Sequence, residues 1–151
     1  MSELKARLRA DLTASMKSRD ETRTRTLRMV LTEISKEEVS GRAARELDDA
    51  EIQRVLTREA KRRREAAEAF SGAGRADQAA AELAEGEILA GYLPAQLTDA
   101  KLAGLVAEAI TQSGAVGPAA IGKVMKAVTP AVAGRADGAR VAAEVRRQLA
   151  G

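Results

Sequence analysis

The chain has 151 residues and a formal net charge of +3, and hydrophobic residues make up 45% of it, with one Phe, one Tyr and no Trp. This length suits one ordinary domain or two small ones, and a chain of this size can bury a core without disulfides. Because the sequence contains no histidine and no cysteine, it excludes Ser-His-Asp triads, Cys-His pairs, thiolate metal sites and zinc held by imidazole.

The N-terminal part of the sequence predicts two amphipathic helices in succession. The first has Ser2 as its N-cap, and its apolar stripe repeats every four residues: Leu4, Leu8, Leu12 and Met16. The second begins at about Asp20 and ends before Gly41, and its stripe consists of Leu27, Val30, Leu31 and Ile34.

The third predicted helix has the clearest start in the chain. Asp48 is expected to be its N-cap and Glu51 the capping-box partner, with Leu47 and Ile52 in the hydrophobic staple positions. Its middle carries the basic run 61–64 among acidic residues. Four consecutive helical residues point around the helix, which favours a solvated surface over a phosphate-binding face. A fourth helix is predicted from Asp77 toward Leu93, and its apolar positions are Leu83, Ile88, Leu89 and Tyr92.

The stretch "GYLPAQLTDAKL" predicts a domain boundary, because Pro94 breaks a helix and Thr98 caps the next one. We therefore expect an N-terminal helical domain over 1–93 and a C-terminal domain over 94–151. Short helices are predicted over 98–113, 118–129 and 137–150, and no segment alternates as a strand does. The predicted fold is all-α, with about four helices followed by a small three-helix bundle.

The tetrapeptide "GRAD" occurs twice, at 74–77 and at 134–137, each time between two predicted helices. Glycine can close one helix in the left-handed conformation and Asp can cap the next, so the repeat is interpreted as a helix stop-and-start signal. This interpretation leaves the roles of Arg75 and Arg135 open, either bracing helix carbonyls or meeting a ligand. The residues expected at structural turns are Gly122, Gly134, Gly138, Asp137, Pro94 and Pro130.

Two further patterns suggest a functional site, one for phosphate binding and one for acid–base catalysis, and we reject both. The stretch "GPAAIGKV" resembles a phosphate-binding loop, but Val124 stands where a Mg²⁺-binding hydroxyl is needed and no strand precedes it. Carboxylate pairs such as Glu37–Glu38 lie at helix ends, with no predicted pocket to separate their pKa values. We therefore predict no catalytic residue, no metal site and no cofactor.

The excess positive charge lies in the C-terminal part. Residues 1–93 contain 18 Lys and Arg against 18 Asp and Glu, whereas residues 94–151 contain 7 against 4. A basic segment of this kind is compatible with phosphate binding.

With these motifs described, the chain resembles the GatB/YqeY family, and in particular a stand-alone YqeY-like protein. The most specific stretch is "IGKVMKAVTPAVAGRADGARVAAEVRRQL", supported by "TLRMVLTEI", "LTREAKRRREAAEAF" and "YLPAQL". The resemblance implies that the C-terminal half is similar to the tail domain of the B subunit of glutamine-dependent aminoacyl-tRNA amidotransferase, a carbon-nitrogen ligase. In that enzyme the tail grips tRNA, while other domains and another subunit perform the chemistry.

The resemblance implies tRNA as the partner, and amidotransferase or another translation component as a further one. With so few aromatic residues, an RNA grip must rest on cationic contacts to phosphate and ribose. The candidate contacts are Lys123, Lys126, Arg135 and Arg140, followed by Arg146 and Arg147. The expected function is a non-catalytic tRNA-binding accessory module.

Two other functions stay open at this stage. The charged helices and alanine-rich faces fit a helical protein–protein adaptor, and an amidotransferase component active by itself is the third reading. The N-terminus "MSELKARLRADL" is charged throughout and no apolar run reaches the length of a membrane span, which predicts a cytoplasmic protein without membrane contact.

Overall fold

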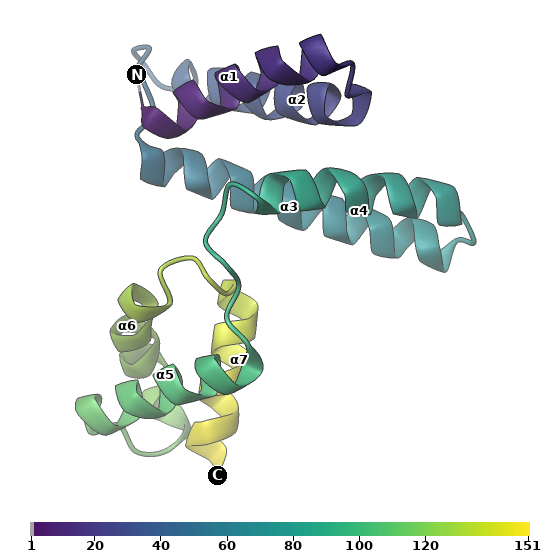
Figure 1. Ribbon diagram of the computed structural model, residues 1–151. Coiled ribbons are helices and arrows are strands. Elements are labelled where there is room, and N and C mark those ends of the chain that lie inside the picture. Colours follow the sequence, from purple (N-terminus) through teal and green to yellow (C-terminus); the bar gives the residue numbers. More distant parts are fainter. Residues whose placement is uncertain (1) are drawn as a thin grey trace. The chain divides into compact units, whose positions relative to one another are not determined.

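The computed structural model describes residues 2–151, and in this range the chain forms seven α-helices and one short 3-10 helix without any strand (Figure 1). This confirms the all-α prediction. The chain divides into two compact units, residues 1–93 and residues 94–151. None of the described helices is both long and apolar enough to cross a membrane.

The first unit consists of two helical hairpins packed on each other. In Figure 1, α1 lies beside α2, and α3 lies beside α4. The helices are α1 (Glu3–Ser18), α2 (Glu21–Glu38), α3 (Asp49–Gly72) and α4 (Ala76–Ala90). Their common core contains fully buried aliphatic side chains from all four helices, namely Leu8, Leu27, Val30, Ile34, Ile52, Leu56 and Leu89.

Short polar side chains begin the first three helices as the sequence predicts. Ser2 accepts a hydrogen bond from the backbone N–H of Lys5, and Asp20 accepts one from the N–H of Arg23. At α3 the capping box is complete, because Asp48 and Glu51 each accept a hydrogen bond from the other's backbone N–H. These bonds satisfy N–H groups that have no partner within the helix.

Two apolar positions differ from the sequence prediction. Met16 is 43% exposed and Leu83 is 54% exposed, although both were expected to face a core. In α4 the inward face is set by small residues: Ala79 is buried, and a Cβ at Gly86 would lie 3.6 Å from the Cβ of Arg63 in α3. Leu83 lies four residues after Ala79 and three before Gly86, at the edge of this small-residue face, and its side chain stays largely exposed.

A largely buried ion pair holds the loop between α2 and α3. The Lys5 ammonium donates to both carboxylate oxygens of Glu38, at 2.7 and 2.9 Å, and Glu38 also accepts from the backbone N–H of Leu47. The hydrogen bond from Lys5 is the main cause that lowers the pKa of Glu38 below its ordinary value of 4.5. The pair therefore joins α1, α2 and the start of α3.

Side chains of the basic run of α3, residues 61–64, pair with carboxylates of the first unit. Glu59 is buried and accepts a hydrogen bond from Arg62 at 2.9 Å. Arg63 crosses to α4, where its Nε lies 3.1 Å from Glu85, and Arg25 of α2 reaches the same carboxylate at 3.2 Å. The interpretation of this run as helix surface rather than a phosphate site agrees with these contacts.

The second unit has its own helices and its own core. Its elements are α5 (Asp99–Ser113), the 3-10 helix η1 (Pro118–Ala120), α6 (Ile121–Val132) and α7 (Gly138–Ala150). Thr98 caps α5 by accepting from the N–H of Lys101, as predicted. The core is made chiefly of valine and leucine: Leu102, Val106, Val124, Val128, Val141 and Val145.

The two "GRAD" copies share the stop signal but not the start signal. Gly74 and Gly134 both adopt left-handed backbone, with φ of 74° and 78°, which glycine tolerates without strain. Asp137 caps α7 by accepting from the N–H of Arg140. Asp77, in contrast, lies inside the first turn of α4, where Arg75 is the N-cap residue and makes no side-chain cap.

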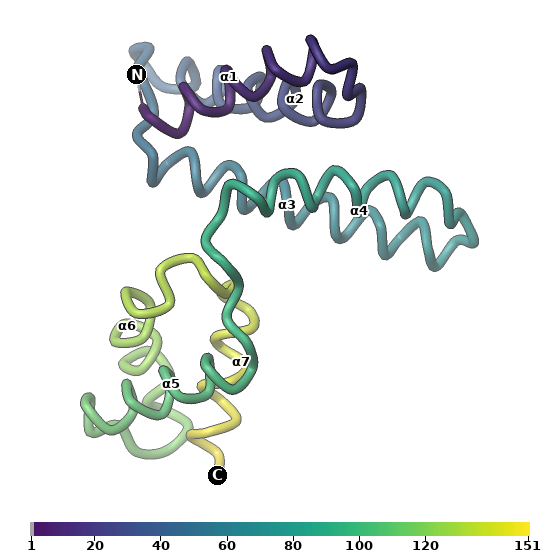
Figure 2. The backbone as a smooth tube through the Cα atoms, in the orientation of Figure 1, coloured from purple at the N-terminus to yellow at the C-terminus, as the bar shows by residue number. Residues whose placement is uncertain are grey.

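Arg135 resolves the question that the repeat left open. Its Nη2 donates to the carbonyl oxygen of Ala131 at 2.7 Å and its Nε to that of Val132 at 3.1 Å. Its own carbonyl oxygen accepts from the N–H of Leu97 at 2.8 Å. Figure 2 shows this loop between α6 and α7 passing beside the segment that precedes α5. Arg135 therefore completes the C-terminus of α6 and ties the loop to the chain before α5.

Three residues expected at turns lie inside helices instead. Gly122 is the second residue of α6, Gly138 is the first residue of α7, and Pro130 lies within α6. Pro130 is tolerated because α6 ends two residues later, so the missing N–H removes a hydrogen bond only in the last turn. Pro94 does lie outside a helix, but α4 has already ended at Ala90.

The Lys5–Glu38 pair predicts an acid-sensitive contribution to stability. The pKa of Glu38 in the folded protein is lowered. The stabilisation that its ionised carboxylate gives is therefore present above the ordinary carboxyl pKa and is lost as the pH falls through the folded-state pKa. Glu38→Gln should lower the free energy of unfolding at pH 7 by about 2 kcal/mol. The difference between wild type and variant should shrink as the pH falls below the ordinary carboxyl value of 4.5. Urea unfolding followed by circular dichroism measures both, and Glu33→Gln on an exposed pair is the control.

Arg135 predicts a second stability effect, in the C-terminal unit. Arg135→Ala removes two hydrogen bonds to helix carbonyls, which should cost about 1–2 kcal/mol and several degrees in Tm. The matched control is Arg75→Ala in the other copy of the tetrapeptide, where no side-chain cap is made. Equal effects of the two substitutions would contradict the bracing role.

Candidate nucleic-acid interface

The six cationic candidates come from two helices and one loop of the second unit. Lys123 and Lys126 lie on α6, Arg135 lies in the loop that follows it, and the others lie on α7: Arg140, Arg146 and Arg147. Because α6 and α7 pack against each other and against α5 through their valines, the charged residues occupy the remaining faces. These positions are predictions from the sequence, and the geometry divides them into two groups.

Three of the candidates are engaged within the unit. Arg135 is half-buried on the α6 carbonyls, and Arg140 donates to Asp99 at 2.7 Å. Arg147 donates to Glu144 through Nε at 2.9 Å and through Nη2. The hydrogen bond from Arg147 is the main cause that lowers the pKa of Glu144 to about 2. A ligand that bound these arginines would have to replace their present partners. The partner of Arg140 is the easiest to replace, because the Asp99 side chain is 98% exposed.

The other three candidates, Lys123, Lys126 and Arg146, are exposed and form no ion pair among the described residues. Lys123 and Lys126 are one helical turn apart, so they share a face of α6. That face lies opposite the buried stripe of Val124, Val128 and Val132. Two unpaired ammonium groups on one turn are suited to contact neighbouring phosphates.

The start of α6 leaves backbone accessible beside Lys123. Neither η1 nor α6 has a side-chain cap, and a Cβ added at Gly122 would meet no atom within 4 Å. The stretch that resembles a phosphate-binding loop therefore forms a 3-10 turn and a helix start. Among the described residues it has no strand before it, whereas a phosphate-binding loop of that type follows a strand.

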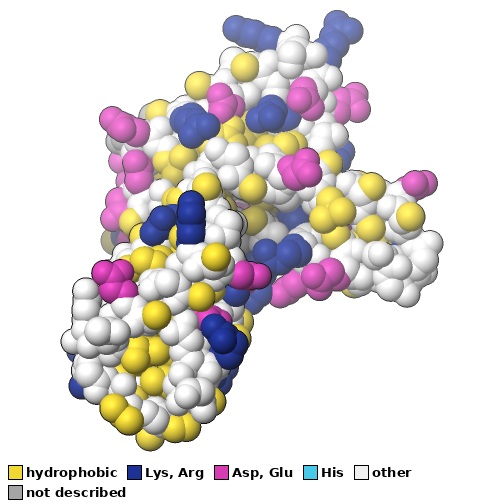
Figure 3. Space-filling model, turned by 60° about the horizontal axis from the view of Figure 1, so that its bottom comes forward, with side chains coloured by type: hydrophobic (Ala, Val, Ile, Leu, Met, Phe, Trp, Pro, Cys, Tyr) yellow, Lys and Arg dark blue, Asp and Glu magenta, His cyan; other side chains and the backbone are white. Residues whose placement is uncertain are grey.

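On the face that Figure 3 shows, the basic side chains do not merge into one continuous patch. At the front of Figure 3 they lie apart from each other around a surface that is largely uncharged or apolar. Among the described residues, no group of three or more Asp and Glu side chains is arranged to hold a metal ion.

Sequence reasoning did not identify a second basic surface, which lies at the end of the α1–α2 hairpin. A groove of about 690 Å³ is lined there by Met16, Arg19, Glu21, Thr24, Arg25 and Arg28. We call it the arginine groove. Its signal in the sequence is the run "RDETRTRTLR", which brings Arg25 and Arg28 to neighbouring positions on α2. Because Lys and Arg are equal in number to Asp and Glu over residues 1–93, the total charge of the first unit did not indicate this local excess.

A single family model covers nearly all of the described chain. No curated protein matches the chain. A family model described as "Yqey-like protein" matches residues 5–149 and so covers both units. The chain belongs to the YqeY-like family, a domain related to the tail of the amidotransferase B subunit.

Proposed function

We propose that this protein is a non-catalytic accessory module that binds tRNA through its C-terminal unit. The observation that carries the proposal is the pair Lys123 and Lys126, which share an exposed turn of α6 and form no ion pair among the described residues. The relation of the family to an amidotransferase tail supports tRNA as the polyanion. The place of action would be the cytoplasm, in translation or in tRNA-dependent amidation.

The mode of binding follows from the side chains present. With one Phe and one Tyr in the chain, stacking of bases on aromatic rings cannot be the general mode. Lysine and arginine contacts to phosphate and ribose read the shape of a folded RNA. Such binding depends steeply on salt and weakly on sequence.

A protein–protein adaptor is the second candidate, and a specific surface favours it. Exposed apolar residues recur along α4 at helical spacing: Ala76, Ala80, Leu83 and Ala84. Small residues at this spacing permit close approach of another helix, and Leu83 would supply the anchor. This reading assigns the function to the first unit and predicts no effect of Lys123 or Lys126.

The proposal predicts that neutralising the α6 lysines weakens tRNA binding. Lys123→Gln/Lys126→Gln should raise the Kd for total tRNA about tenfold at moderate salt. The slope of log K against log salt should fall by about 2, because each phosphate contact contributes roughly one. Fluorescence anisotropy across a salt series with the full chain measures both quantities.

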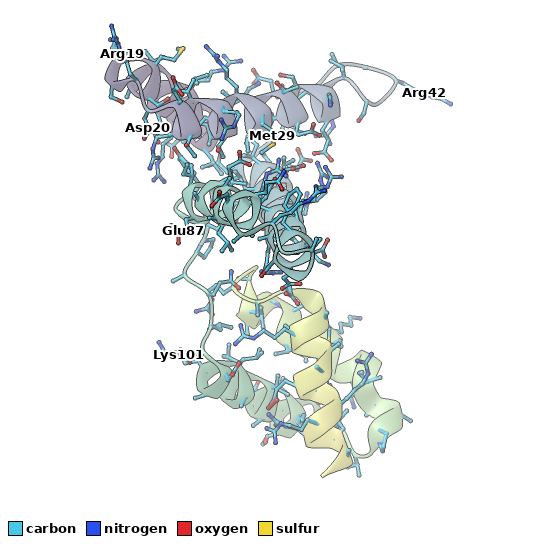
Figure 4. The ribbon with its side chains drawn as sticks, turned by 90° about the vertical axis from the view of Figure 1, so that its right-hand side faces the viewer. Arg19, Asp20, Met29, Arg42, Glu87 and Lys101 are labelled. Atoms are coloured by element: carbon cyan, nitrogen blue, oxygen red, sulfur yellow. The ribbon has the colours of Figure 1, made fainter. Side chains whose placement is uncertain are left out.

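The controls separate this function from its rivals. Lys101→Gln changes an exposed lysine at the start of α5, labelled in Figure 4, and should leave the Kd nearly unchanged. Absence of tRNA binding by the wild type at low salt would reject the proposal. Glutaminase or transamidation activity of the purified chain alone would instead support an active amidotransferase component.

A further inference from the structure

We infer a second nucleic-acid site, on the first unit: the arginine groove binds the phosphodiester backbone of a single-stranded polynucleotide. The groove measures about 690 Å³ and is open to solvent, so a strand can lie along it without being enclosed. It is formed by the last turn of α1 and the first two turns of α2. It belongs to the first unit alone and is independent of the α6 lysines.

The charge of the groove favours an anion. Three arginines line it against one carboxylate, that of Glu21. Arg25 is fixed by Glu85, which its Nε approaches at 3.2 Å. A guanidinium has five N–H donors, so this contact leaves Arg25 able to donate further. Even when Glu85 is included, three positive charges against two negative ones leave an excess of one.

Arg19 and Arg28 are the two arginines available to a ligand. Both are exposed, and neither forms an ion pair among the described residues. The planar guanidinium matches two phosphate oxygens at once and also stacks on flat rings. Two such groups on one groove can therefore hold two neighbouring phosphates of one strand.

Met16 distinguishes a nucleotide from other anions. Its side chain is 43% exposed within the groove, and its Sδ accepts a hydrogen bond from Nη2 of Arg28 at 3.2 Å. A thioether makes favourable contacts with the edges and faces of aromatic rings. A polynucleotide would cover Met16 with a base while the arginines hold phosphate. An acidic peptide without apolar side chains would occupy the arginines and leave Met16 in water.

The backbone conformation at Arg19 gives no structural reason for an arginine side chain at this turn. Arg19 is the C-cap residue of α1 and has a φ of 60°, a left-handed conformation that helix ends usually assign to glycine. Figure 4 shows Arg19 at the end of the hairpin with its side chain extending away from the helices. Glycine would make this turn with less strain, so Arg19→Gly removes the charge without weakening the fold.

The test compares two double variants with identical amino-acid changes. Arg19→Gly/Arg28→Gln alters the groove. Arg42→Gly/Arg54→Gln alters two exposed arginines of the same unit that do not line it, and Figure 4 shows Arg42 at the opposite end of the α1–α2 layer from Arg19. The probe is a fluorescein-labelled oligouridylate of about ten nucleotides, within the site sizes of single-strand binders. Binding to the full-length protein is followed by anisotropy from low to moderate salt.

We expect the groove variant to raise the Kd at least about tenfold and to lower the salt slope by about 1.4, which corresponds to two lost single-strand phosphate contacts. Its Tm should equal or exceed that of the wild type. The control variant should change the Kd less than about twofold. Equal loss in both variants, or no binding of the oligonucleotide by the wild type at low salt, would overturn the inference.

Two further outcomes keep this inference separate from the proposed function. Binding of a poly-glutamate peptide through Arg19 and Arg28, without oligonucleotide binding, would assign the groove to a protein partner and reject the nucleic-acid site. Lys123→Gln/Lys126→Gln should leave oligonucleotide binding at the groove unchanged. The failure of one site therefore does not entail the failure of the other.

Discussion

Internal pairing decides which cationic side chains of this chain can meet a ligand. Charge by itself does not make a binding surface, because a cation already held by a carboxylate or by helix carbonyls must exchange one partner for another. Arg63 is held between α3 and α4, and Arg135 is held on the end of α6. The exposed lysines of α6 and the arginines of the groove differ from them in this respect, and both proposals rest on that difference.

The scarcity of aromatic residues acts on stability and on recognition together. Cores of leucine, isoleucine, valine and alanine allow close helix contacts, as at Ala79 and Gly86, where α4 approaches α3. The same composition removes the flat rings on which most single-strand binders stack bases. In both proposals, recognition comes from guanidinium and ammonium groups, and in the arginine groove also from the thioether of Met16. This chemistry gives weak discrimination between sequences and strong dependence on salt.

The helices were predictable because their signals are local. Asp48 with Glu51, Thr98 and Asp137 each cap the helix that their spacing indicates. Local patterns could not predict which side chains pair with residues that are distant in the sequence. Met16 and Leu83 fit apolar stripes yet lie outside the core, and Arg140 pairs with Asp99 across 41 positions. The candidate site depends on such long-range pairing, so the sequence predicted its basic residues but not which of them stay unpaired.

Each of the two basic surfaces is small. The α6 face offers two unpaired lysines with Arg146 on the next helix, and the groove offers two unpaired arginines with Arg25 beside them. A few phosphate contacts give weak binding at physiological salt when they act alone. Two weak sites on one chain become effective when a single ligand engages both, because the second contact is then intramolecular. A long polyanion carries enough phosphates for both surfaces, whereas a mononucleotide carries enough for one at most. The two proposals together therefore favour a whole RNA molecule over any small phosphate as the ligand.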